Sequence, residues 1–278
     1  MSTAATVDSV ATLHGAGGFS LKPYAKETKY EFLRLLRARS FSFSTIGFPV
    51  CFYLLFGVVA AGGGAESSQR ATYLLATYAV FGLVGSSLFG LCSTIANERA
   101  QGWLELKQAS PMPRMAYLLA KLLTAMAFAL IIFGILLLCG TTMAHVHFTF
   151  TQIVKLMATV ILGVFPFASM GILLASLVPP NASIGFVNLI YLPMSFLSGL
   201  WFPLLGLPRW IQKMAPVWPT WHLGQLALHD VGLPFTAMQA TGVTSQWSVA
   251  GHVIWLAVFS AVCLAIAARR FRASAMKA

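Results

Sequence analysis

The sequence predicts an all-α integral membrane protein with six transmembrane helices, and three observations point to this fold class. Of its 278 residues, 58% are hydrophobic and only 9% are charged, whereas a soluble domain carries about 25% charged residues. Six apolar runs are long enough to cross a bilayer, which takes about 20 helical residues. Lys and Arg outnumber Asp and Glu 18 to 7. In a membrane protein this excess indicates topology before it indicates nucleic-acid binding, so no nucleic-acid partner is expected.

The predicted spans lie at about 41–61, 71–95, 118–143, 152–177, 184–202 and 249–268, and together they form one transmembrane domain, 41–268. An even number of spans places both termini on the same side of the membrane. Fourteen of the 18 basic residues fall on that side, which identifies it as the cytoplasm. Residues 1–21 lack the basic start and apolar middle of a signal peptide, so they are expected to form a flexible tail.

Three segments outside the spans carry their own signals. Residues 22–40 mix apolar and basic side chains, which is typical of an amphipathic helix lying on the inner membrane surface, with a plain cytoplasmic helix as the alternative. Residues 203–248 interleave Trp and Pro, which favours short external helices that enter the outer leaflet and turn back. Residues 269–278 are expected to form a basic cytoplasmic tail.

No catalytic or metal site is predicted. The dipeptide Gly-Lys of a phosphate-binding P-loop never occurs, so ATP binding by this chain is not expected. His222 and His229 are seven residues apart on one helical face, and His145 and His147 form an external pair, but neither pair has a third ligand at a convincing spacing. No charged residue lies near the centre of a span, which argues against ion-coupled transport and favours an external energy source.

Two predicted spans carry stripes of polar or small residues. In span five the stripe consists of Asn188, Tyr191, Ser195 and Ser198, spaced by three, four and three residues. It could line a translocation pathway or serve helix packing. In span two, small residues recur at every fourth position, namely Gly82, Ser86, Gly90 and Thr94, and close packing is the favoured interpretation there.

Two motifs resemble those of type-2 ATP-binding cassette (ABC) export permeases. The loop after span two has the family's order of Glu, Gly, Leu, Ser-Pro and a basic residue opening span three, here Glu98, Gly102, Leu104, Ser110-Pro111 and Lys121. The stretch after span five is similar to the family's external signature, here Ser198-Gly199, Phe202-Pro203 and Leu207-Pro208 with Trp210. Trp103 is a departure, because small residues are common after the Gly.

The resemblance implies a division of labour. A homodimer of permease chains would form the pathway in the bilayer of the bacterial inner membrane, and two copies of a separate ABC ATPase subunit would bind ATP and Mg. A coupling helix at about 98–108 would contact each ATPase, through Glu98, Arg99, Gly102, Trp103, Leu104 and Glu105. On this basis charge reversal at Glu98 is expected to uncouple transport without affecting membrane insertion.

The same resemblance places the pathway along spans two and five. Its candidate lining is Tyr78 and Phe81 together with the span-five stripe, and its external gate is Phe202, Pro203, Pro208 and Trp210. An amphipathic drug, a lipid or a lipid-linked glycan would suit such a pathway. Two other functions stay open at this point: a membrane-embedded lipid-modifying enzyme that uses His222 and His229, and a membrane scaffold that transports nothing.

Overall fold

The structure, a computed structural model, describes residues 21–60, 65–103, 106, 114–233 and 247–275. Within these ranges the chain is helical and contains no strand. Among the residues that the structure describes, five helices are long and apolar enough to cross a membrane: Arg39–Val59, Ser67–Ala100, Met115–Thr142, Phe150–Leu177 and Val249–Phe271. Their positions agree closely with predicted spans one to four and six.

The helices follow one another with few long connections. The N-terminal part holds α1 (Lys22–Arg37), α2 (Arg39–Phe52), the π-helix η2 (Tyr53–Val59), α3 (Ala65–Leu88), the π-helix η3 (Phe89–Ser93) and α4 (Thr94–Ala100). The middle holds α6 (Arg114–Thr142), α7 (Phe150–Leu177), the 3-10 turn η4 (Pro180–Ala182) and α8 (Ser183–Leu197). The last part holds η5 (Leu204–Gly206), α9 (Arg209–Met214), η6 (Ala215–Val217), α10 (Pro219–Asp230) and α12 (Val249–Ala275).

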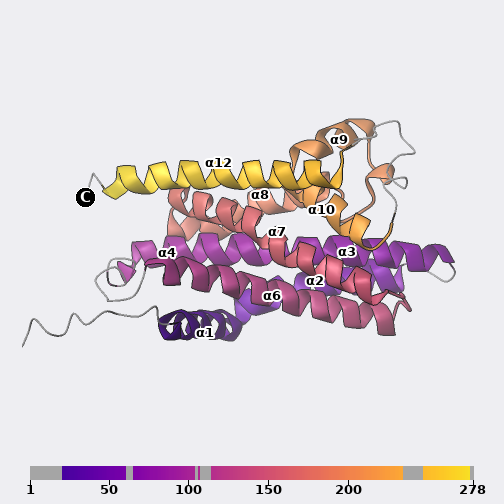
Figure 1. The fold of residues 1–278 in the computed structure, drawn as a ribbon, viewed down its shortest axis with the longest axis horizontal. Coiled ribbons are helices and arrows are strands. Elements are labelled where there is room, and N and C mark those ends of the chain that lie inside the picture. Colours follow the sequence, from indigo (N-terminus) through magenta and orange to yellow (C-terminus); the bar gives the residue numbers. More distant parts are fainter. Residues whose placement is uncertain (1–20, 61–64, 104–105, 107–113, 234–246, 276–278) are drawn as a thin grey trace, which may run out of the picture.

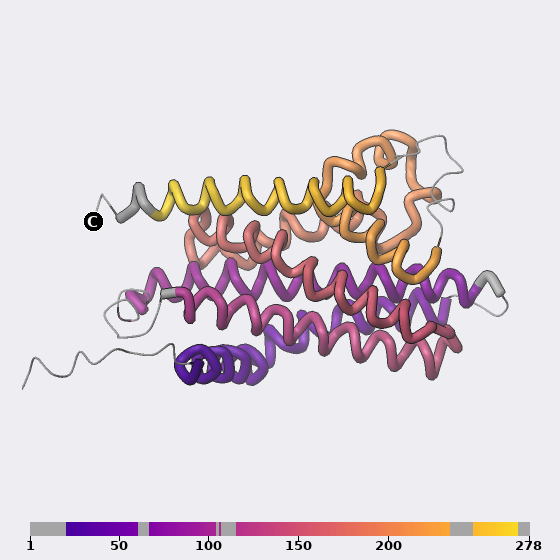
Figure 2. The backbone as a smooth tube through the Cα atoms, viewed as in Figure 1, coloured from indigo at the N-terminus to yellow at the C-terminus, as the bar shows by residue number. Residues whose placement is uncertain are grey.

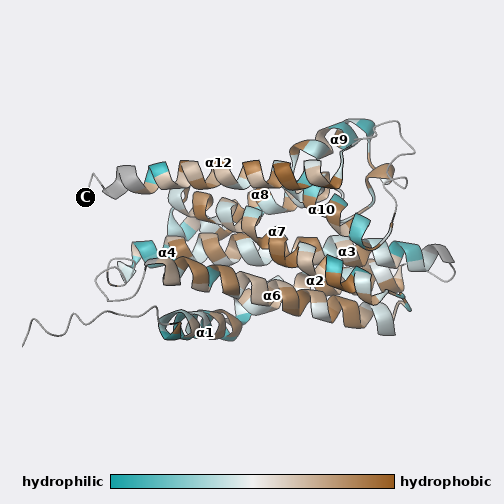
Figure 3. Cartoon of the chain, in the orientation of Figure 1, coloured by the Kyte–Doolittle hydropathy of each residue, from teal (hydrophilic) through white to brown (hydrophobic). Residues whose placement is uncertain are grey.

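The long helices lie side by side along one axis, and the remaining elements gather at the two ends of the bundle (Figure 1). One end carries α1, α4 and the C-terminal part of α12, whereas α9 and α10 lie at the other end, as the chain trace in Figure 2 also shows. Apolar residues dominate the middle of the long helices, and hydrophilic residues concentrate towards the ends (Figure 3). This banding is the pattern expected of helices that cross an apolar layer.

The helix formed by α3, η3 and α4 is the centre of the bundle. Its most apolar stretch is 94% buried inside the chain, whereas the corresponding stretch of α12 is only 17% buried. Small residues bring the neighbouring helices close to it: a Cβ added at Gly82 would lie 2.6 Å from Ile132 of α6. Helix packing in membranes depends on such small residues, so the interpretation of Gly82 as a packing position fits the structure.

The predicted fifth span, 184–202, is occupied by a shorter helix. At 15 residues, α8 is about 22 Å long, which is less than the roughly 30 Å of a bilayer's apolar core. Two prolines, Pro179 and Pro180, precede the helix. After Leu197 the chain turns at Gly199, whose φ of +80° is a left-handed conformation that favours glycine. The short elements η5, α9, η6 and α10 follow, at the opposite end of the bundle from α1.

Candidate functional site

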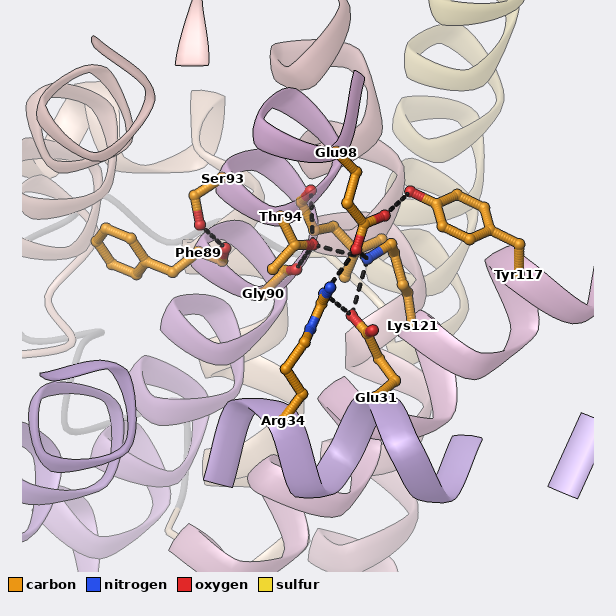
Figure 4. Close-up of polar contacts among 10 residues, drawn as sticks. Glu31, Arg34, Phe89, Gly90, Ser93, Thr94, Glu98, Tyr117 and Lys121 are labelled. Carbon is orange, nitrogen blue, oxygen red and sulfur yellow. Dashed lines mark hydrogen bonds and ion pairs between the residues drawn. The ribbon is translucent and has the colours of Figure 1, made fainter. Parts of the chain in front are cut away.

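Four charged side chains from three separate helices meet at the end of the bundle that carries α1 and α4 (Figure 4). Glu31 and Arg34 come from α1, Glu98 comes from α4, and Lys121 comes from α6. Glu31, Glu98 and Lys121 are 5%, 4% and 2% exposed. These four side chains, together with Thr94 and Tyr117, are called the charged cluster below. Two acids and two bases make the cluster neutral overall.

Lys121 lies at the centre of the charged cluster. Its Nζ atom is 2.8 Å from Glu31 Oε1 and 3.1 Å from Glu98 Oε1, and it donates a third hydrogen bond of 3.0 Å to Thr94 Oγ1. An ammonium group has three donors, and all three are used here. A buried charge is tolerated when it is paired and fully hydrogen-bonded, and Lys121 meets both conditions.

The outer part of the cluster joins α1 to α4. The Arg34 Nη2 atom is 2.8 Å from Glu31 Oε1 and 2.6 Å from Glu98 Oε1. Tyr117 donates a hydrogen bond of 2.6 Å to Glu98 Oε2. Burial lowers the pKa of the Arg34 guanidinium, but the carboxylates of Glu31 and Glu98 raise it by more, so its pKa lies above the ordinary value. Arg34 therefore stays charged.

The local sequence explains why α1 turns Glu31 inwards. Glu31 and Leu35 are four residues apart, so they share one face of α1, and both are buried. The Phe32 ring packs against Phe128 of α6, with the ring centroids 5.5 Å apart. Ser42 of α2 donates hydrogen bonds to the carbonyls of Leu35 and Leu36 at the end of α1. These bonds hold the two helices together where the chain changes direction. The charged cluster thus fixes α1, α4 and the start of α6 to one another.

The predicted coupling residues fall into four groups. Glu98 does not face outwards, as pairing with charges on another protein would require, because it is buried and bonded to Lys121, Arg34 and Tyr117. Arg99 donates a hydrogen bond of 3.5 Å to the Val178 carbonyl. Gly102 adopts a left-handed φ of +72° just after α4 ends, and Trp103 is 50% exposed. Leu104 and Glu105, together with residues 107 and 108 of the predicted coupling helix, lie outside the described residues.

Lys121 opens the third predicted span, and the structure places it inside the bundle. Two carboxylates hold it there. Sequence reasoning did not identify Glu31, Arg34, Lys121 and Tyr117 as parts of one site. The available signal was Glu31, an acid on the apolar face of a mainly basic helix.

The candidate pathway residues lie mostly inside the chain. Tyr78, Phe81, Tyr191, Ser195 and Ser198 are all at most 5% exposed. Tyr191 donates a hydrogen bond of 2.8 Å to the Phe81 carbonyl and stacks on the Phe81 ring at 4.7 Å. Tyr78 donates a longer hydrogen bond, 3.4 Å, to the Trp201 carbonyl. These side chains join α3 to α8 and to the chain after it.

Asn188 differs from the rest of the stripe, because it is only half-buried. Its neighbours Ile184 and Leu189 are among the exposed apolar residues of α8. The predicted gate residues Phe202, Pro203, Pro208 and Trp210 are all exposed, at the end of the bundle opposite α1. Of these, Phe202 contacts Phe56 edge-on, with ring centroids 5.2 Å apart.

The structure separates the two histidines that the sequence places on one helical face. His222 is fully buried, with its Nδ1 atom 2.9 Å from His252 Nδ1 and its Nε2 atom 2.9 Å from the Pro216 carbonyl. It stacks on the Trp255 ring at 4.3 Å. His229 has a half-exposed side chain beside Asp230. His222 and His229 therefore do not converge on a shared site.

Comparison with known proteins gives the family. Residues 27–229, more than half of the chain, match the family described as ABC-2 type transporter. The chain belongs to the ABC-2 type transporter family. It is also 24% identical over 200 residues to a Bacillus subtilis (strain 168) protein named "Putative transport permease YvfS", and the matched region covers 72% of this chain and 81% of that protein.

Membership of the ABC-2 family, together with the apolar helices, makes this chain a multi-pass transmembrane permease of an ABC transporter. The resemblance inferred from the two motifs is confirmed. Such permeases transport and are not enzymes, and the family as a whole works with an ABC ATPase. The charged cluster lies within the matched region and connects α1 to the residues beside the predicted coupling helix.

Proposed function

We propose that this ABC-2 permease belongs to an exporter of the bacterial inner membrane and couples to ATP hydrolysis through the segment that follows α4. The observation that carries the proposal is the charged cluster, which holds α4 rigidly beside this segment. In the proposed assembly two copies of the chain pair in the membrane, and two ATPase subunits dock at the end formed by α1 and α4. Exposed Lys22, Lys26 and Lys29 lie at this end, which suits a cytoplasmic position.

The exposure of each side chain indicates its role in the coupling segment. The helix that ends with α4 spans 34 residues, on the order of 50 Å, so it extends beyond an apolar layer of about 30 Å. Glu98 is occupied inside the bundle, so it holds α4 in place. Trp103 is exposed beside the left-handed Gly102 and is therefore available to a partner. Tryptophan is enriched among residues that dominate binding energy at interfaces.

The substrate class that we propose is amphipathic: a drug, a lipid or a lipid-linked glycan. The side chains that α8 leaves exposed are mainly apolar, and half-buried Asn188 adds a polar group among them. The most apolar stretch of the first span, Arg39–Val59, is only 22% buried inside the chain, which leaves apolar surface for lipid or for the second copy. A pathway between two copies would use these outward residues, with Asn188 as its polar contact.

Replacing Trp103 by Ala is expected to weaken binding of the ATPase about tenfold or more, because truncating a central interface Trp commonly costs at least that much. The measurement is the amount of ATPase that co-purifies with the chain after gentle solubilisation. Trp210→Ala is the matched control, since Trp210 is similarly exposed, at 58% against 50%, at the opposite end of the bundle. Equal loss of ATPase in both variants, or none in either, would contradict the assigned docking end.

Replacing His222 by Phe is expected to leave ATP-dependent activity in place while lowering stability by about 1–3 kcal/mol, because the ring volume is kept but the two nitrogen contacts are lost. Thermal unfolding and ATP hydrolysis of the co-purified complex are the two measurements. His229→Ala is the control and should change neither. Loss of ATP hydrolysis in a His222→Phe variant that keeps the wild-type unfolding midpoint would contradict this purely structural role.

A further inference from the structure

The central helix of the bundle is interrupted by a π-helical segment, η3 (Phe89–Ser93), between α3 and α4. In a π turn each N–H bonds to the carbonyl five residues earlier, so the turn holds one residue more than an α turn. The Ser93 and Thr94 hydroxyls donate hydrogen bonds to the carbonyls of Phe89 and Gly90. Side-chain hydroxyls of this kind allow an irregular backbone to persist within a membrane helix.

The two sides of η3 are bonded to different parts of the molecule. On the α4 side, the charged cluster ties Glu98 and Thr94 to α1 and α6, and Arg99 donates a longer hydrogen bond of 3.5 Å to the Val178 carbonyl at the end of α7. On the α3 side, Phe81 accepts a hydrogen bond from Tyr191 of α8, and Tyr73 donates one of 2.7 Å to the Gly199 carbonyl beyond α8. Helix α6 packs along α3 as well, through apolar contacts such as that of Ile132 at Gly82 and one long hydrogen bond of 3.5 Å from Ser86 to the Ala125 carbonyl.

The two faces of η3 are packed differently, with open space beside Gly90 and close contact with α7 at Gly171. Within 4 Å of a Cβ added at Gly90 there is one atom, the Phe41 Cζ at 3.9 Å. On the opposite side, α7 presents Gly171, where an added Cβ would lie 3.1 Å from Leu91 Cβ and 3.2 Å from the Ser87 carbonyl oxygen. A glycine at position 171 therefore keeps α7 from pressing on the π segment. Sharp bends in helices occur at π segments of this kind.

We propose that η3 is the hinge at which α4, α1 and the start of α6 move as one body relative to α3 and α8 when the ATPase acts. This inference rests on the proposed coupling at the segment after α4. A continuous α-helix would transmit a push along its whole length. A π segment between two separately bonded halves instead concentrates the bend within five residues, close to the charged cluster.

Deleting Gly90 tests the hinge directly. Because a π turn holds one extra residue, removing it converts η3 into an α turn while α3 and α4 keep their present facing and contacts. The matched control is Gly90→Ala, which keeps the residue count and meets only the Phe41 ring at an ordinary contact distance. Both variants of the full chain are reconstituted in lipid nanodiscs with the co-purified ATPase. Amide hydrogen exchange over residues 86–96 is followed with and without Mg²⁺ and ATP.

For the deletion variant we expect exchange at residues 89–94 to slow by about tenfold, because a regular helix opens less often than a π segment. We also expect the ATP-dependent change in exchange at these residues to disappear, together with the stimulation of ATP hydrolysis by the permease. Gly90→Ala should behave like the wild type. An ATP-dependent change that persists in a folded deletion variant would overturn the hinge.

Two further outcomes are distinguishable. If the deletion variant does not fold, Gly171→Ala replaces it, since its Cβ presses on Leu91 and Ser87, and it should reduce the ATP-dependent change; an undiminished change would again overturn the hinge. If no ATPase co-purifies with the wild type, the proposed coupling fails. The hinge is then judged on ATP-independent exchange alone, where equal rates in the wild type and the deletion variant would refute it.

Discussion

Replacing Lys121 by Met is expected to destabilise the folded protein strongly. The substitution leaves Glu31 and Glu98 buried with Arg34 as their only cation in the charged cluster, and Arg34 is itself partly exposed. Removing one partner of a buried ion pair costs about 3–5 kcal/mol, because the remaining charge stays buried without compensation. Since folded proteins are stable by only about 5–15 kcal/mol, the loss should be visible as a lower midpoint of thermal unfolding in detergent.

The control for this prediction is the double variant Lys121→Met with Glu31→Gln. It removes one base and one acid together, so the buried cluster stays neutral, and Arg34 remains paired with Glu98. We expect the double variant to recover much of the stability lost in the single variant, as coupled residues do in double-mutant cycles. If the two substitutions are simply additive, Lys121 is not paired with Glu31 in the membrane.

Replacing Glu98 by Lys is expected to abolish folding rather than coupling. The sequence alone suggests that charge reversal here uncouples transport and leaves insertion intact. The structure predicts otherwise, because the new ammonium group would lie beside Lys121 and Arg34, with Glu31 as the single acid in the charged cluster. We expect destabilisation of at least about 3–5 kcal/mol, as for other unpaired buried charges, measured as loss of monodisperse protein on size-exclusion chromatography.

The variant Glu98→Gln is to be compared with the charge reversal Glu98→Lys. Its amide keeps the shape of the carboxylate, Lys121 still pairs with Glu31, and Arg34 can turn towards water because 41% of its side chain is exposed. We expect a cost of only about 1–3 kcal/mol from the weakened hydrogen bonds, so this variant should fold and report on coupling. A well-folded Glu98→Lys variant would show that Glu98 faces out of the bundle.

The long helices could be predicted from the sequence because apolar composition over 20 or more residues is a strong local signal. The predicted first span, 41–61, compares with Arg39–Val59, and the predicted fourth, 152–177, compares with Phe150–Leu177. The fifth span was predicted too long, since its apolar run continues through Leu200 and Phe202 after the helix has ended at Leu197. Hydrophobicity alone does not mark that end, which depends on the turn at Gly199.

The charged cluster could not be predicted in the same way, because its members are far apart in the sequence. Lys121 is separated from Glu31 by 90 positions and from Glu98 by 23. Near the end of a helix, each of these residues has an ordinary interpretation as a group that reaches water. The motif match correctly drew attention to Glu98, but only the packing of α1 against α6 shows that its side chain turns inwards. The π segment likewise has no distinct signal in a single sequence.

The positions of the cluster residues also matter for how the chain is made. A ribosome synthesises Glu31 before the first span, Glu98 at the end of the second and Lys121 at the start of the third. While only two spans have been inserted, both acids exist and their central base does not. The third helix therefore supplies the base that makes the cluster neutral. A chain interrupted before residue 121 has only Arg34 to pair with the two acids.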